Sequence, residues 1–173
     1  MKKVRYLAYG SNMLTERLQA RCPSATPRGI ARVDNYVLSF SKKSRDGSGK
    51  ATLLPKTGEV AFGVIFDLNE TELVKLDTAE GAGQGYDRID SFSAHDEMSE
   101  GIVQVVTYLS DAASLESTLK PYDWYLCLVI VGARQHNLPQ GYVDAIQSIR
   151  PTTDPKPGRK TRQEALRFLE NCA

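Results

Sequence analysis

Two short stretches of this sequence combine residue types that could hold a small substrate and move a proton. The first, "YLAYGSNM" over residues 6–13, is an apolar run that breaks off into Gly-Ser-Asn. The second, "LDTAEGAGQGYDR" over residues 76–88, places Glu80 directly before three closely spaced glycines. Bare backbone can approach a ligand closely, and a positioned carboxylate can act as a general acid–base.

The Gly-Ser-Asn stretch is expected to present backbone donors. Gly10 can adopt a positive φ and leave the backbone open, while Ser11 and Asn12 can turn the chain through local side-chain hydrogen bonds. The next segment begins a helix, so a row of N–H groups would lie between a strand end and a helix start. Such donors suit an anion or a developing oxyanion. Taken alone, the tripeptide is also what an ordinary turn uses.

Glu80 is the carboxylate best placed for chemistry. It ends a short predicted helix, with Asp77 one turn earlier. A carboxylate there meets the negative end of the helix dipole, and inside a cavity it would also lose water, conditions that suit a general acid–base. The alternative is a solvated residue at the helix end.

Several other motifs fail on their spacing. The glycines of "EGAGQGYD" do not follow the dinucleotide-binding pattern, and "SRDGSGKAT" has Ser44 and Ala51 where a phosphate-binding loop needs glycine and a hydroxyl residue. The two histidines and the three cysteines, Cys22, Cys127 and Cys172, match neither zinc spacing nor a disulfide framework. We therefore expect neither a metal nor another cofactor.

Composition favours one ordinary domain over residues 1–173, with a tail and a helix in 151–173. Hydrophobic residues make up 41% and charged residues 25% of the 173 positions. The formal net charge of +1 argues against binding to nucleic acid or an anionic membrane. Neither a signal-peptide pattern nor a membrane-spanning apolar run is present, so a cytoplasmic, reduced protein is expected.

The pattern of apolar residues predicts six or seven strands, mostly early in the chain, followed by helices. Strands are expected at 4–9, 29–41 (with a turn at Asp34-Asn35), 51–55, 59–68, 86–94 and 101–110. Helices are expected at 15–22, 69–81, 122–137, 139–149 and 160–171. Short connections imply antiparallel pairing. The predicted fold is therefore α+β, a small, mostly antiparallel β-barrel with surrounding helices.

Several stretches, taken in order, resemble the γ-glutamylcyclotransferase family, with its AIG2-like fold. They are "YLAYGSNM", "GIARVDNYVLSF", "GKATLLP", "EVAFGVIFDL", "LDTAEG" and "YLCLVIVGARQHNLPQGYVDAI", so the likeness covers about residues 4–150. The resemblance implies a barrel-like fold with its cavity at the YGSN loop. It also implies conversion of a small γ-glutamyl compound to 5-oxoproline and a free amine, without a cofactor.

The resemblance also assigns site residues. It implies Glu80 as the catalytic acid/base, and a substrate-binding set of Tyr9, Gly10, Ser11, Asn12, Tyr86, Tyr108 and Tyr125, with Tyr122 as a rival to Tyr125. The protein would be a monomer or homodimer. Two alternatives remain, a relative that removes a γ-glutamyl group from a biosynthetic intermediate and a non-enzymatic binder of a small acid or a protein. The basic loop 41–50 could meet an acidic substrate or simply be solvated.

Overall fold

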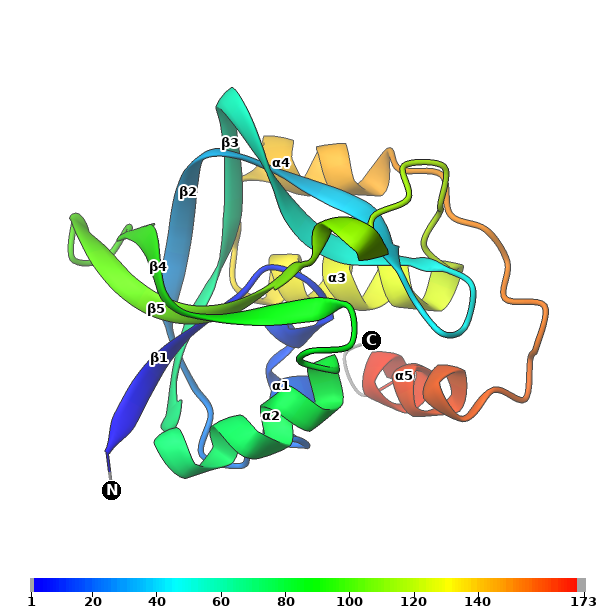
Figure 1. Ribbon diagram of the computed structural model, residues 1–173, viewed down its shortest axis with the longest axis horizontal. Coiled ribbons are helices and arrows are strands. Elements are labelled where there is room, and N and C mark those ends of the chain that lie inside the picture. The colour runs from blue at the N-terminus through cyan, green and yellow to red at the C-terminus, as the bar shows by residue number, and fades with distance from the viewer. Residues whose placement is uncertain (1, 171–173) are drawn as a thin grey trace.

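The computed structural model describes residues 2–170, which form one sheet with helices packed around it (Figure 1). The strands are β1 (Lys3–Ala8), β2 (Thr26–Lys43), β3 (Gly49–Asn69), β4 (Tyr86–Asp96) and β5 (Gly101–Ser110). The α-helices are α1 (Thr15–Gln19), α2 (Leu73–Glu80), α3 (Asp123–Gln135), α4 (Gln140–Gln147) and α5 (Lys160–Glu170). Short 3-10 helices are η1 (Ser11–Met13), η2 (Glu70–Glu72) and η3 (Ala112–Ser114).

The sheet has the strand order β1-β3-β2-β4-β5 and closes on itself. Four neighbouring pairs are antiparallel, and a parallel bridge between Tyr6 and Val106 joins β1 to β5. The predicted α+β class is confirmed. The sheet is mixed, because β1 and β5, the first and last strands in this order, pair in parallel.

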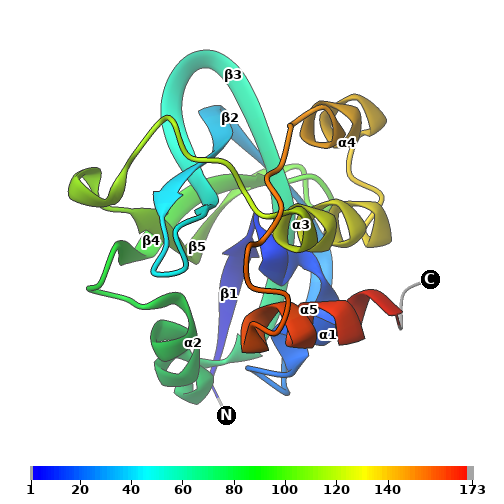
Figure 2. The same cartoon turned by 90° about the vertical axis from the view of Figure 1, so that its right-hand side faces the viewer.

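The prediction of six or seven strands with a turn at Asp34-Asn35 is wrong. β2 runs through this point, and Asn35 has a left-handed φ of 61° at an irregularity in the pairing with β3. The segments expected as two strands, 51–55 and 59–68, are one strand whose middle donates the N–H of Gly58 to Asn35 Oδ1 at 3.0 Å. The polar residues therefore mark a β-bulge, which bends a ladder without ending it. Figure 2 shows β3 arching over at this bend.

Helix α3 packs against the turn that follows β1 and contains the YGSN residues. Its apolar face is buried, which confirms the predicted helix despite its β-prone Leu-Val-Ile-Val run. Gly132 lets the backbones touch: a Cβ there would lie 2.5 Å from the backbone nitrogen of Leu14 and 2.8 Å from the carbonyl carbon of Met13. The position of η1 is therefore set by direct contact with α3.

The segment before α5 is anchored to α3 through a buried carboxylate. Asp154 accepts hydrogen bonds from Arg159 Nε at 2.7 Å, Arg159 Nη2 at 3.0 Å and Trp124 Nε1 at 3.0 Å. Helix α5 then packs beside α3, at the right of Figure 1. The end of the predicted 160–171 helix and Cys172 lie outside the described residues. Within residues 2–170, no helix is both long and apolar enough to cross a membrane.

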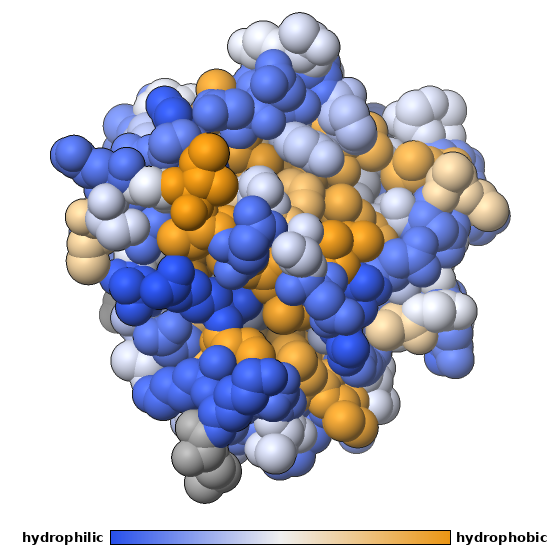
Figure 3. All heavy atoms as spheres, turned by 60° about the vertical axis from the view of Figure 1, so that its left-hand side comes forward, coloured by the Kyte–Doolittle hydropathy of each residue, from blue (hydrophilic) through white to orange (hydrophobic). Residues whose placement is uncertain are grey.

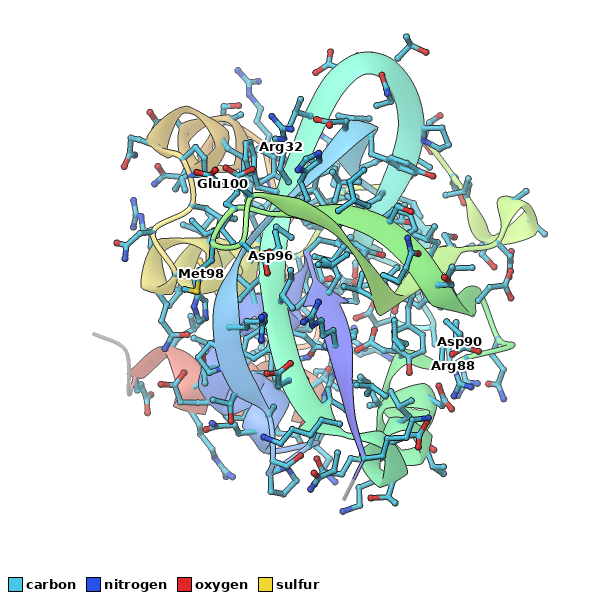
Figure 4. All side chains as sticks on the ribbon, turned by 90° about the vertical axis from the view of Figure 1, so that its left-hand side faces the viewer. Arg32, Arg88, Asp90, Asp96, Met98 and Glu100 are labelled. Atoms are coloured by element: carbon cyan, nitrogen blue, oxygen red, sulfur yellow. The ribbon has the colours of Figure 1, made fainter. Side chains whose placement is uncertain are left out.

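The β4–β5 hairpin projects away from these helices, at the left of Figure 1. Met98 and Ile102 at its tip are 72% and 69% exposed. Figure 4 shows Met98 and Glu100 at this tip and Arg88 near the other end of β4. Figure 3 shows hydrophobic atoms interspersed with hydrophilic side chains on the same side of the molecule. Scattered exposure of this kind is normal for a protein surface.

Candidate active site

The strand end, the end of α2 and the start of α3 enclose a narrow recess of about 30 Å³. All eight residues that the resemblance assigned to a site line it. The full lining is Tyr6, Tyr9, Gly10, Ser11, Asn12, Ala51, Glu80, Tyr86, Tyr108 and Tyr125. Tyr122 does not line the recess, and its hydroxyl donates instead to the carbonyl of Asp46 at 2.8 Å. Of the two rival tyrosines, Tyr125 is therefore the one at the candidate site.

Glu80 enters the recess from the last turn of α2. Gly81, with φ 70°, ends the helix in the left-handed conformation that glycine favours. Glu80 Oε1 accepts hydrogen bonds from Asn12 Nδ2 at 2.9 Å and from Arg21 Nη1 at 2.6 Å. The Glu80 side chain is 19% exposed. It is thus a fixed, half-buried carboxylate and not a solvated residue at a helix end.

The backbone of the YGSN turn is accessible to a ligand, but not because Gly10 adopts the positive φ that was expected. Gly10 has φ −115°, so it does not use a positive φ. A Cβ at Gly10 would instead lie 3.0 Å from Ala51 Cβ and 3.4 Å from Tyr125 Oη, so glycine is needed for space. Within residues 2–170, no hydrogen bond is found from the N–H groups of residues 10–12. These groups remain available as donors to a ligand.

Local side-chain hydrogen bonds of Ser11 and Asn12 were expected to turn the chain. In the structure these side chains instead bond to residues of other elements. Asn12 Nδ2 donates to both Glu80 Oε1 and Tyr6 Oη, the latter at 3.0 Å. Ser11 Oγ accepts from Arg17 Nε at 3.2 Å. The turn is therefore held by α1, α2 and β1 together, which ties its shape to the rest of the fold.

The tyrosine hydroxyls are fixed by hydrogen bonds around the recess. Tyr86 Oη donates to the carbonyl of Ala51 at 2.6 Å, and the N–H of Ala51 donates to Tyr125 Oη at 3.2 Å. Burial raises the pKa of the Tyr86 and Tyr125 hydroxyls, so both stay protonated at neutral pH. Because Tyr125 Oη accepts a bond, its own proton can be donated to a ligand.

Tyr108 is oriented by charged residues outside the recess. Its hydroxyl donates to Asp77 Oδ1 at 2.6 Å, and its carbonyl accepts from the Tyr9 hydroxyl. Asp77 Oδ2 in turn pairs with Arg88 Nη1 at 2.6 Å. Arg88 also bonds Asp90, its neighbour in Figure 4. Asp77, one turn before Glu80, therefore has a supporting role in the site.

Sequence reasoning missed two residues at the centre of the site. Arg21 Nη1 bonds Asn12 Oδ1 at 2.8 Å as well as Glu80, so it joins the two predicted stretches. Tyr6 accepts from the same asparagine. Arg17 and Arg21 stand four residues apart, the spacing that puts side chains on one face of a helix, and this was the available signal for Arg21. Tyr6 has the pattern of an ordinary strand residue.

The recess opens into a larger outer chamber of about 410 Å³. The two share Ser11, Glu80, Tyr86 and Tyr125. Most of the remaining lining is basic and includes Arg17, Arg21, Lys42, Arg45, Lys50, Arg159 and Lys160. The last two belong to the C-terminal segment, for which no site role was expected from the sequence. Within residues 2–170, no group of three or more His, Cys, Asp or Glu side chains could hold a metal ion.

Comparison with known proteins places this chain in a family. The model of the AIG2-like family matches residues 60–146. The γ-glutamylcyclotransferases of Bos taurus and Homo sapiens are each 32% identical over 152 residues, which cover 84% of this chain and 78% of each relative. A solved structure of a γ-glutamyl cyclotransferase superposes with a TM-score of 0.85 at 27% identity, over 96% of this chain and 99% of that one. YkqA from Bacillus subtilis, at 20% identity and a TM-score of 0.71 over 88% of this chain and 57% of its own, shares the fold. The chain therefore belongs to the γ-glutamylcyclotransferase family of AIG2-like proteins.

Proposed function

We propose that this protein is a γ-glutamylcyclotransferase that converts a γ-glutamyl amino acid or amine to 5-oxoproline and the free amine. One observation carries the proposal: the Glu80 carboxylate bonds the Asn12 side chain in a recess lined by open YGSN backbone. The relatives named γ-glutamylcyclotransferase support the same reaction.

The reaction needs a proton to leave one nitrogen and reach another. The α-ammonium of the γ-glutamyl group must lose a proton before its nitrogen attacks the γ-carbonyl carbon. A new C–N bond then closes a five-membered ring, and the carbonyl oxygen gains negative charge. When the bond to the leaving nitrogen breaks, that nitrogen takes up a proton. The α-ammonium carries three protons and the ring nitrogen of 5-oxoproline keeps one, so two protons pass in all and the leaving amine ends as an ammonium. One carboxylate that accepts each proton from the attacking nitrogen and returns it to the leaving nitrogen balances the reaction.

Glu80 is the residue we assign to this proton transfer. Arg21 Nη1 lies 2.6 Å from the Glu80 carboxylate and holds it in place at the recess. The bonds from Arg21 and Asn12 both go to Oε1. Oε2 is therefore the oxygen left for the substrate, and the two nitrogen donors fix its direction.

The YGSN turn is proposed to hold the γ-carbonyl oxygen. The free N–H groups of residues 10–12 and the Tyr125 hydroxyl are donors fixed before the substrate arrives. Fixed donors of this kind stabilise an oxygen as it becomes negative. A recess of about 30 Å³ admits a single small group such as this carbonyl. The remainder of the substrate would then lie in the outer chamber.

An assay for 5-oxoproline tests the proposal. Wild-type protein and the variant Glu80→Gln would receive γ-glutamyl-alanine, γ-glutamyl-glutamate, γ-glutamyl-ε-lysine and glutathione, with product measured by NMR. We expect turnover by the wild type and a loss of about 10²-fold or more in kcat for Glu80→Gln. Glu70→Gln is the matched control, because Glu70 is exposed and pairs with Lys2.

The two parts of the proposal fail separately. Equal rates for wild type and Glu80→Gln would leave the reaction standing and remove Glu80 from it. Absence of product from every substrate, in protein shown to be folded, would contradict the cyclotransferase function and favour a relative that only binds.

A further inference from the structure

The outer chamber carries much more positive charge than the protein as a whole. Seven Lys and Arg side chains line it, against the two carboxylates of Asp46 and Glu80. The formal net charge of the whole chain is only +1. Because the chamber continues from the recess, this charge faces the part of the substrate that becomes the leaving amine.

Some of these cations are already neutralised within the protein. Lys50 pairs with Asp46 at 2.9 Å, and Arg159 makes two bonds to the buried Asp154. Arg21 pairs with the proposed acid–base carboxylate. Their charges are therefore not the ones that await a ligand.

Lys42 is different, because the residue is largely buried, lines the chamber and makes no ion pair among residues 2–170. The residue is 8% exposed, and within residues 2–170 its ammonium has no carboxylate or hydrogen-bond acceptor as a partner. The ammonium lies 4.7 Å from the centre of the Tyr86 ring. A Cβ at Gly85 would be 3.1 Å from Lys42 Nζ, so glycine there leaves room for the ammonium. Burial lowers the pKa of Lys42.

Arg17 also has no carboxylate partner among the described residues, and it is half-buried, whereas Arg45 and Lys160, which likewise lack one, are exposed. Its Nε donates to Ser11 Oγ at 3.2 Å, and burial lowers the pKa of its guanidinium to about 10. Both cations thus sit beside residues that the chamber shares with the recess: Lys42 beside Tyr86, and Arg17 beside Ser11. Keeping two cations partly dehydrated is costly unless anions complete the site.

We propose that the leaving amine is an acidic amino acid, whose two carboxylates neutralise Lys42 and Arg17. This inference rests on the proposed cyclotransferase function and assigns the substrate class as γ-glutamyl derivatives of glutamate or aspartate. A γ-glutamyl derivative of a simple amino acid brings two carboxylates to the chamber, the α-carboxylate of the glutamyl group and that of the leaving amino acid, and an acidic leaving amino acid adds a third. Lys42 is then a specificity-determining residue for this added carboxylate.

A pair of substrates that differ by one charge tests the inference. γ-Glutamyl-glutamate and γ-glutamyl-glutamine have nearly the same shape. In low-salt buffer we expect kcat/KM to be at least about 10-fold higher for the acidic substrate, mainly through KM, with a smaller ratio at high salt. Equal kcat/KM values for the two substrates would overturn the inference while leaving the cyclotransferase intact. Failure to turn over either substrate or γ-glutamyl-alanine would instead contradict the proposed function.

Two adjacent lysines provide a matched pair of variants. Side chains alternate along a strand, so Lys42 is buried while Lys43 is exposed and lies 3.7 Å from Glu116. Lys42→Gln is expected to bring the ratio of the two kcat/KM values close to one, and Lys43→Gln to leave it unchanged. A ratio that Lys42→Gln does not alter would remove Lys42 from the assignment. The wild-type comparison decides the substrate class even if Lys42→Gln fails to fold.

Discussion

Gly132→Ala should damage the active site from a position that no substrate touches. The added Cβ would lie 2.5 Å from the backbone nitrogen of Leu14, whereas ordinary contacts begin near 3.4 Å. The atoms in the way belong to backbone, which cannot rotate aside. Either α3 or η1 must therefore retreat by roughly 1 Å, and η1 carries Ser11 and Asn12.

The displacement has two measurable consequences. Overpacking of this kind typically costs about 1–3 kcal/mol of folding free energy. A misplacement of roughly 1 Å in a preorganised site can cost about 10²-fold in rate, which we expect in kcat/KM for 5-oxoproline formation. Urea unfolding and the product assay on the same preparation measure both effects.

Gly141→Ala is the control, because it makes the same change in α4. A Cβ at Gly141 would meet nothing within 4 Å. Alanine has the higher helix propensity, so this variant should keep wild-type kinetics and gain up to about 1 kcal/mol of stability. Wild-type kcat/KM and stability in Gly132→Ala would refute the reasoning that α3 positions the YGSN turn.

Three further perturbations follow from the contacts of single residues. Arg21→Gln should lower kcat about 10- to 100-fold with a smaller change in KM, because the acid–base carboxylate loses a positioning partner, as steady-state kinetics would show. Tyr86→Phe leaves a buried strand carbonyl unpaired and should cost about 1–3 kcal/mol in urea unfolding. Hydrogen bonds from Arg159 hold the pKa of Asp154 below its usual range. Their stabilisation is present above the ordinary carboxyl pKa of about 4 and is lost as pH falls towards the lowered value, which Trp124 fluorescence should report.

Each of these predictions has an outcome that would contradict it. A change confined to KM in Arg21→Gln would indicate substrate binding and not positioning of the carboxylate. Unaltered stability in Tyr86→Phe would mean that the strand carbonyl finds another donor. An Asp154→Asn variant that keeps the acid-induced change in Trp124 fluorescence would show that another group titrates.

The fold class followed from sequence because apolar periodicity is a local property. Long runs such as α3 and β5 were found close to their true bounds. The bulge at Asn35 was mistaken for a turn, because Asp-Asn supplies the same left-handed backbone to both. A bulge differs from a turn only in that β2 continues to pair with β3 on both sides of the bend. That pairing joins residues far apart in the sequence, so a local pattern does not reveal it.

The candidate site was partly predictable for a similar reason. Glu80 and the YGSN residues stand in contiguous motifs, so a family resemblance could point to them. Arg21, which follows α1, and Lys42, on β2, acquire their roles only when the fold brings them to the end of α2. The need for glycine at position 10 likewise came from the approach of Ala51 and not from its own φ.

The most direct test of the central claim asks where the oxygen atoms of the product come from. Wild-type protein would convert a γ-glutamyl dipeptide in water enriched in oxygen-18, with products identified by mass spectrometry. Attack by the substrate's own α-amine uses no water, so we predict 5-oxoproline without label and an equal amount of free amino acid. Glutamate carrying one oxygen-18 atom in its γ-carboxylate as the first product would contradict the claim, because it would show that water is the nucleophile.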